Sequence, residues 1–149
     1  MLAAHAALPR RLYRALNDRA GSTIRELFGA QSTAIDMPSG RRFLGEEGVA
    51  RLLAEWSSAF GDGRVEIVRV LPSREGATVE FVFRGRQTGA LDTMSGRVAA
   101  TGSLVELNRC DVMDIAGERI VRLHSYYDAA TLLVQLGVAG VEEERQPNS

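Results

Sequence analysis

The chain has 149 residues, of which 45% are hydrophobic and 25% are charged, and its formal net charge is −1. This length is enough for one domain with a single apolar core, and the composition is ordinary for a soluble globular protein. Because the net charge is close to zero, the chain lacks the excess of positive charge that binds nucleic acid, and we expect no nucleic-acid partner.

The cysteine content and the hydropathy pattern indicate in which cellular compartment the protein is expected. Cys110 is the only cysteine, so no internal disulfide can form, which fits a reducing cytoplasm. No apolar run approaches the roughly 20 residues that span a bilayer, so we expect no membrane contact and a cytoplasmic protein. We predict one domain over residues 1–141, and the charged, proline-containing segment 142–149 is predicted to be a disordered tail.

Three helices are expected in the N-terminal part. Leucines recur at helical spacing over residues 3–16, although Pro9 favours a stable part that begins there. A second, short helix is expected from Ser22 to Gly29, followed by a short strand over residues 32–37. The third helix, over residues 45–60, has the clearest apolar stripe, formed by Val49, Leu52, Leu53, Trp56 and Phe60.

Alternating side chains predict four consecutive strands, over residues 64–71, 77–85, 103–115 and 119–128. The residues expected on one face of the third strand are Val105, Leu107, Arg109, Asp111 and Met113. On the last strand, one face is expected to carry Val121, Leu123, Ser125 and Tyr127, and the other Ile120, Arg122, His124 and Tyr126. Asp128 and Gly137 then mark the start and the end of a short C-terminal helix.

This order of elements predicts an α+β fold in which a curved antiparallel sheet packs against the three N-terminal helices. Helices on one face of such a sheet can enclose an apolar pocket, which is a normal place for a small-molecule substrate. The connection over residues 86–102 is rich in Gly and Thr and is long for a simple hairpin. Long loops in small domains are often functional.

Five short motifs occur in one order along the chain: G-R-Q-T-G-A-L from Gly85, A-A-T-G from Ala99, C-D-V-M from Cys110, G-E-R-I-V from Gly117, and Y-D with L-L-V-Q-L-G from Tyr127. They resemble G-T-H-T-G-P-L, P-P-T-G, C-D-V-Y/F, D-G-R-I-V and Y-D…L-L-x-Q-L-G of the SnoaL-like polyketide cyclases, a family within the nuclear-transport-factor-two-like superfamily. The resemblance covers about residues 12 to 138. It implies a cone-shaped α+β barrel, a homodimer or higher homo-oligomer, and neither metal nor organic cofactor.

The resemblance also implies an enzyme of secondary metabolism, such as antibiotic biosynthesis, that closes a ring in a polyketide or similar apolar intermediate. In the family's aldol-type cyclases a pocket aspartate is the general base, and the usual position lies three residues before the Y-D aspartate. Here that residue is Ser125, and a serine at its normal pKa cannot abstract a C–H proton. Either the base lies elsewhere, or the closure is of a non-aldol type such as a cycloaddition, which needs mainly shape and orientation.

Two other functions stay open at this point. One is an epoxide hydrolase or isomerase of the same fold, which would need a carboxylate that activates water or moves a proton. The other is a non-enzymatic module that only binds a small molecule.

Five residues are candidates for catalysis: Asp111, Asp36, Ser125, Tyr127 and His124. Asp111 stands among apolar residues, where its pKa should be raised, unless it forms a structural ion pair with Arg109. Asp36 either lies at the pocket rim or caps a turn into Pro38, and two aspartates facing one cavity could share a proton. Tyr127 can donate a hydrogen bond or pack in the core. Strict alternation places His124 on the opposite face from Ser125, unless a bulge reverses it.

A second set of residues is expected to bind the substrate. Arg109 would either orient Asp111 or bind a substrate carboxylate, and Gln87 stands at the pocket mouth where the family often has histidine. The full set is Trp56, Phe81, Phe83, Gln87, Leu107, Arg109, Met113 and Leu123.

Overall fold

The computed structural model describes residues 1–138. The helices are α1 (Leu2–Asn17), α2 (Gly21–Leu27), α3 (Gly45–Ala59) and α4 (Ala129–Gln135). The strands are β1 (Thr33–Asp36), β2 (Arg41–Leu44), β3 (Arg64–Pro72), β4 (Gly76–Arg86), β5 (Leu91–Thr93), β6 (Gly96–Val98), β7 (Leu104–Ala116) and β8 (Arg119–Tyr127). The predicted tail, 142–149, lies outside the described residues.

Six strands form one curved sheet in the order β2-β1-β8-β7-β4-β3. The four consecutive strands β3, β4, β7 and β8 pair antiparallel, as predicted, but β1 pairs parallel with β8, so the sheet is mixed. The sequence reading also missed β2, which forms a hairpin with β1. Side-chain alternation indicates on which face of the sheet a residue lies, but it does not indicate whether two paired strands run parallel or antiparallel.

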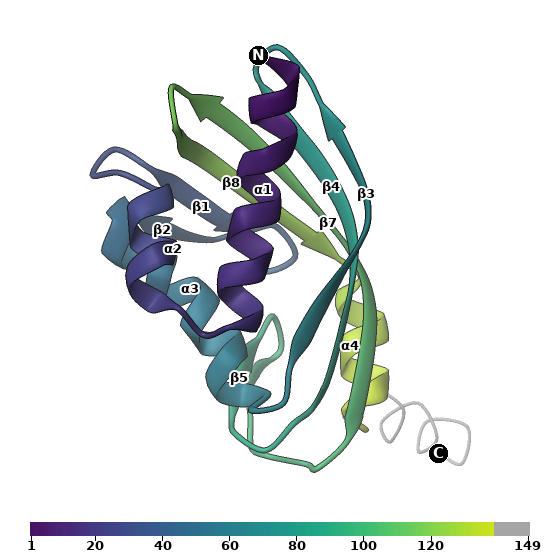
Figure 1. The fold of residues 1–149 in the computed structure, drawn as a ribbon. Helices are drawn as coiled ribbons and strands as arrows, with labels where there is room; N and C mark the ends of the chain where they lie inside the picture. The colour runs from purple at the N-terminus through teal and green to yellow at the C-terminus, as the bar shows by residue number, and fades with distance from the viewer. Residues whose placement is uncertain (139–149) are drawn as a thin grey trace, which may run out of the picture.

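Helices α1, α2 and α3 cover one face of this sheet. Figure 1 shows α1 lying across the hollow of the sheet, with α2 and α3 beside it, while α4 lies against β7 at the other side. Helix α1 begins at Leu2, before Pro9, and its residues Leu12 and Tyr13 are buried in the core. The predicted α+β architecture with three N-terminal helices is confirmed.

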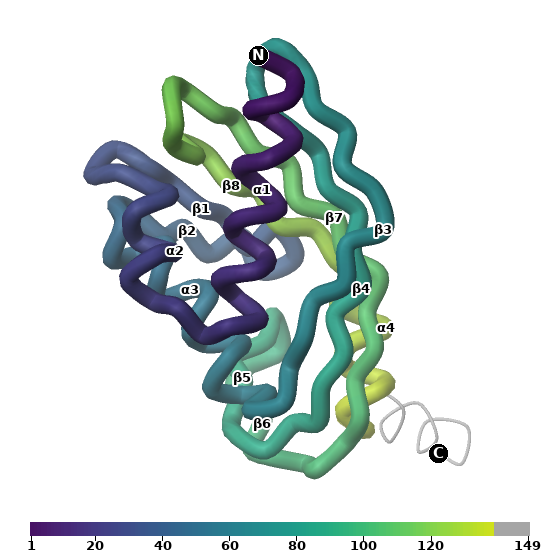
Figure 2. Tube along the Cα trace, in the orientation of Figure 1, coloured from purple at the N-terminus to yellow at the C-terminus, as the bar shows by residue number. Residues whose placement is uncertain are grey.

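The long connection between β4 and β7 contains its own small hairpin. Strands β5 and β6 pair with each other and form a separate two-stranded sheet near α3, which is easiest to follow in Figure 2. This hairpin was predicted only as a long loop, because its strands are three residues each.

A bulge in β8 makes one part of the predicted alternation wrong. The register of β7 and β8 shifts so that Ile115 pairs with Ile120 and Asp114 pairs with Arg122, which leaves Val121 between them. Ile120 therefore faces the core and is completely buried, opposite to the prediction. Beyond the bulge the alternation holds, so Leu123 and Ser125 face inward.

The C-terminal helix has the predicted ends. Asp128 caps it, with Oδ1 accepting from the Ala130 amide at 3.0 Å and Oδ2 from the Thr131 hydroxyl at 2.7 Å. Gly137 follows the helix with a φ of +80°, the left-handed conformation that glycine adopts most readily. Within residues 1–138, every helix is too short or too polar to cross a membrane.

Candidate active site

A cavity of about 60 Å³ lies between the inner face of the sheet and helices α1 and α3. Its walls are mainly aromatic and aliphatic, and Trp56 packs edge-on against both Phe83 and Tyr127. The exposed residues of its lining, Arg19 and Arg64, place the mouth between the end of α1 and the start of β3. The polar side chains inside are Asn17, Ser57, Arg109, Asp111 and Ser125.

Asp111 is the carboxyl group of this cavity. It lies on the inward face of β7 and is 5% exposed. The Tyr13 hydroxyl donates a 2.6 Å hydrogen bond to its Oδ2, whereas Oδ1 has no hydrogen-bond partner in residues 1–138. Burial raises the pKa of Asp111, and this effect outweighs the opposing influence of the Arg109 charge and of the Tyr13 and Ser125 hydroxyls.

Arg109, two residues earlier on β7, packs against two aromatic rings that stand nearly perpendicular to each other. Its guanidinium carbon lies 4.2 Å from the centre of the Trp56 ring and 4.5 Å from that of Tyr127. Its Nη2 donates to the Ser125 hydroxyl oxygen at 2.7 Å, and its Nε is buried without an acceptor in the described chain. The alternative in which Arg109 and Asp111 form a direct ion pair is not realised: across residues 1–138, Arg109 takes part in no ion pair within 4.0 Å.

Asp36, Ser125 and Asp111 form a row across three neighbouring strands. In the sheet register, Ser125 lies opposite Asp36 of β1 on one side and opposite Asp111 of β7 on the other. Neighbouring strands are about 4.8 Å apart, so a whole strand separates the two carboxylates. The two carboxylates therefore cannot share one proton directly, and the hypothesis that Asp36 and Asp111 do so is wrong.

Asp36 is buried but lies outside the lining of the cavity. Its Oδ2 accepts a hydrogen bond from the Ser39 hydroxyl, and its backbone carbonyl accepts from the Gly40 amide, so it closes the turn between β1 and β2. Tyr127 lies between Asp36 and Arg109: burial first, and then the Asp36 charge, raise the pKa of its hydroxyl, while Arg109 opposes this. The pocket-rim role proposed for Asp36 is thus replaced by the turn-capping alternative.

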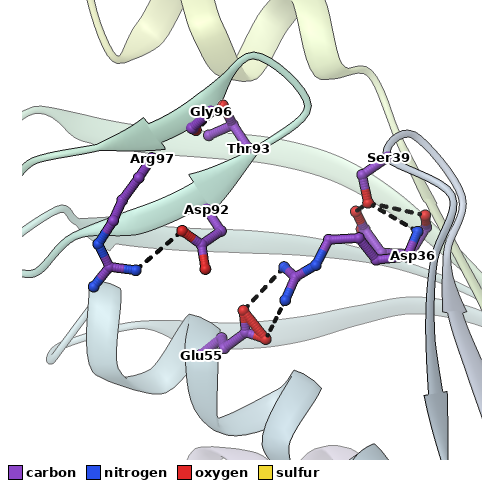
Figure 3. A network of polar contacts seen from close by, with 8 residues as sticks. Asp36, Ser39, Glu55, Asp92, Thr93, Gly96 and Arg97 are labelled. Atoms are coloured by element: carbon purple, nitrogen blue, oxygen red, sulfur yellow. Dashed lines mark hydrogen bonds and ion pairs between the residues drawn. The ribbon is translucent and has the colours of Figure 1, made fainter.

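A separate polar cluster stands beside this turn, outside the cavity (Figure 3). Arg41 of β2 donates to both carboxylate oxygens of Glu55 on α3, at 3.0 and 3.2 Å, and Glu55 raises the pKa of Arg41. Arg97 pairs with Asp92 across the β5–β6 hairpin at 3.0 Å. These pairs are partly exposed, so each contributes little to stability, at most about 1 kcal/mol.

Besides Asp36 and Tyr127, four of the proposed site residues lie outside the lining of the cavity. His124 pairs with Val112 on the outer face of the sheet, because the bulge precedes Arg122 and leaves the register of His124 unchanged. Leu107 and Met113 face inward but are buried in the core beside the cavity. Gln87, placed at the mouth by prediction, is completely buried in its own loop.

Gln87 holds together the two ends of the β4–β7 connection. Its Nε2 donates to the carbonyls of Val98 and Ala99, at 3.1 and 3.3 Å. Its Oε1 accepts from the amide and the hydroxyl of Thr101, at 3.0 and 2.6 Å. Its contacts are therefore those of a structural residue.

The structure brings together in one cavity Trp56, Phe81, Phe83, Arg109, Asp111, Leu123 and Ser125. The sequence reading missed five lining residues with polar or charged groups: Tyr13, Asn17, Arg19, Ser57 and Arg64. Tyr13 is the important omission. It lies on the buried side of α1, and an aromatic hydroxyl within an apolar helix face was a signal that it would need a buried partner.

Comparisons with known proteins identify the family of this chain. The family model described as SnoaL-like polyketide cyclase matches residues 6–136. Among curated proteins, no sequence matches this chain.

Solved structures give the same fold at low identity. A protein assigned as a SnoaL-like polyketide cyclase from Jannaschia sp. CCS1 superimposes with a TM-score of 0.80 at 17% identity, over 90% of this chain and 92% of that one. A protein with a ketosteroid isomerase-like fold from Catenulispora acidiphila DSM 44928 gives 0.74 at 19% identity, over 90% and 95%. An LEH-like epoxide hydrolase from M. tuberculosis gives 0.70 at 16% identity, over 91% and 86%.

This protein belongs to the class of cone-shaped α+β proteins. Its fold encloses an aromatic cavity that contains one buried carboxyl group. The chain belongs to the SnoaL-like polyketide cyclase family. Membership of this family supports an enzymatic role as a cyclase.

Proposed function

We propose that this protein is a cyclase that folds a polyketide-like apolar intermediate in the cavity and closes a ring, with Asp111 as the acid/base. The observation that carries the proposal is the buried Asp111 carboxyl, which has a raised pKa, one oxygen held by Tyr13 and the other without a partner in the described chain. A carboxylate of raised pKa is a stronger base than an exposed one.

The proposed reaction needs only side chains of this chain. In its ionised form, Asp111 removes a proton from a carbon next to a substrate carbonyl. The resulting enolate attacks a second carbonyl of the same molecule, which forms the new carbon–carbon bond, and the alkoxide produced takes the proton back from Asp111. Tyr13 fixes Oδ2, so Oδ1 is the oxygen that carries the proton.

The aromatic walls would supply the orientation. Trp56, Phe81 and Phe83 come from one helix and one strand, and they give the cavity rigid flat surfaces on which an unsaturated chain can fold. Holding the two reacting carbons in contact is itself worth several powers of ten in rate. The same walls would suffice for a closure that uses no base, such as a cycloaddition.

The test is turnover of a synthetic linear β-polyketone thioester by the wild type and by Asp111→Asn, across the range of about pH 5 to 9, with the products identified by mass spectrometry. Proton-transfer catalysis predicts that Asp111→Asn loses about 10²- to 10⁴-fold and that the wild-type rate falls at low pH through one ionisation. Asp114→Asn is the matched control, because Asp114 lies on the same strand and pairs with Arg122 instead of lining the cavity.

Two results would overturn parts of the proposal. Equal rates for Asp111→Asn and the wild type, flat with pH, would leave a shape-directed closure in place of acid/base chemistry. Incorporation of oxygen from labelled water in place of a new ring would favour a hydrolase of this fold.

We also propose that the protein works as a homodimer or higher homo-oligomer. The outer face of the sheet carries exposed side chains with large apolar surfaces at Val112 and Tyr126. The half-buried Cys110 of β7 pairs with Tyr126 of β8 on the same face. Light scattering coupled to gel filtration would test this, and a monomer at micromolar concentration would contradict it.

A further inference from the structure

The charge of Arg109 is not balanced inside the cavity. Its guanidinium packs against the rings of Trp56 and Tyr127, and Ser125, which accepts from its Nη2, is neutral. Arg109 is half-buried with a buried Nε, and a cation that is withdrawn from water is normally paired with a carboxylate. Within residues 1–138 no carboxylate oxygen approaches it to 4.0 Å.

The remaining charges of the lining increase this imbalance. Arg19 and Arg64 stand at the mouth, so the lining contains three arginines and one carboxyl group. Arg19 is held in place by backbone carbonyls, with its Nη2 donating to Phe60 and Gly61 at 3.1 and 2.7 Å. The one acid, Asp111, has a pKa raised by burial and forms no ion pair with Arg109 within the described residues.

The contacts of Arg109 leave one of its N–H edges for a ligand. The rings of Trp56 and Tyr127 stand nearly perpendicular to each other and both pack against the guanidinium, so they hold it in place. Nη2 donates to Ser125, whereas Nε, on the edge of the guanidinium, has no acceptor in the described chain. Such an edge matches the two oxygens of a carboxylate, and a stacked arginine loses little conformational entropy when it binds.

We propose that the cavity binds apolar molecules that carry a carboxylate, with the carboxylate on the free edge of Arg109 and the apolar body against the aromatic walls. Arg19 and Arg64 attract such an acid to the mouth, and their effect is screened by salt. This rests on the proposed function in so far as the same cavity holds the substrate. It specifies a substrate class, and it holds whether or not Asp111 moves a proton.

The test compares benzoate with benzamide, which has almost the same shape but no charge, by isothermal titration calorimetry at neutral pH. Trp56 is the only tryptophan of the chain and touches Arg109, so its fluorescence is a second readout located at the site. We expect benzoate to bind about 10-fold or more tightly than benzamide, which is the range of one charge-assisted pair. The preference should weaken as salt is added.

Variants of Arg109 test whether this residue causes the preference for benzoate. Arg109→Met should abolish the preference for benzoate, and Arg109→Lys, which keeps the charge, should retain part of it. Arg69→Met is the matched control, because Arg69 lies on β3, outside the cavity, in an exposed pair with Glu80, and it should bind as the wild type does. Circular dichroism of each variant checks its fold, and the wild-type comparison stands even where Arg109→Met does not fold.

Equal affinity of the wild type for benzoate and benzamide would overturn the proposal, as would the absence of benzoate binding at millimolar concentration or an unchanged preference in Arg109→Met. These results do not depend on turnover. A cyclase that rejects benzoate would refute the inference and leave the proposed function intact, whereas a protein that prefers benzoate but closes no ring would do the reverse.

Discussion

The Tyr13 hydroxyl donates a 2.6 Å hydrogen bond to Asp111 Oδ2, although 98 positions of sequence separate the two residues. Both groups are buried, and the bond fixes which carboxyl oxygen remains free in the cavity. It also stabilises the ionised form of Asp111 and so lowers the pKa of that carboxyl against the larger effect of burial.

Tyr13→Phe should therefore shift the pH dependence of turnover. Without the phenol the pKa of Asp111 rises further, so the pH at which activity is lost moves upward. The lost buried bond should also cost about 1 to 3 kcal/mol of unfolding free energy. Turnover across pH together with urea denaturation checks both effects, and an unshifted profile would remove Tyr13 from the acid/base system.

Asp111→Asn should stabilise the folded protein at neutral pH while it reduces activity. The folded-state pKa of Asp111 is raised, so this group favours folding below its unfolded-state pKa and loses that contribution as the pH rises through the folded-state pKa. A neutral amide avoids this loss, and we expect a gain on the order of 1 kcal/mol at neutral pH that disappears at acidic pH. Urea unfolding at two pH values measures it; a destabilised Asp111→Asn at neutral pH would contradict the expectation.

Ser125→Asp should change both the charge balance and the proton chemistry. A carboxylate at this position would stand where Arg109 Nη2 now bonds the serine oxygen, at 2.7 Å, and would pair with the cation. It would also lie opposite Asp111 and raise the pKa of Asp111 by like-charge repulsion. We expect the preference for benzoate over benzamide to fall to about that of Arg109→Met. Ser125→Ala, which adds no charge, should keep the preference.

His124→Ala should leave turnover within about twofold of the wild type, because His124 lies on the outer face of the sheet. Steady-state kinetics at neutral pH is the measurement. A loss of more than about tenfold would show that the outer face takes part in the reaction.

Gln87→Leu should destabilise the protein without changing the pH dependence of turnover. The substitution leaves the Thr101 amide and the carbonyls of Val98 and Ala99 without their partner, at a cost of about 2 to 3 kcal/mol. The exposed Gln31→Leu is the control and should change the unfolding free energy by less than about 0.5 kcal/mol. An altered pH profile in a folded Gln87→Leu variant would restore this residue to the reaction.

The sequence by itself determined most of the helices and the long strands, and it determined which residues of β7 share a face. Periods of two and 3.6 are set by backbone geometry, so Leu107, Arg109, Asp111 and Met113 could be assigned to one face and Trp56 to the apolar stripe of α3. The Asp128 cap and the Gly137 stop are local chemistry, and the motifs were enough to identify the family.

Only the tertiary structure decided which of these residues meet. Tyr13 reaches Asp111 because α1 packs across the sheet, and packing between distant segments leaves no periodic trace in the sequence. The row of Asp36, Ser125 and Asp111 depends on the parallel pairing of β1 with β8, and the inward turn of Ile120 depends on one bulge. Register and docking are set by the summed burial of many side chains, so they are fixed only when the whole core assembles.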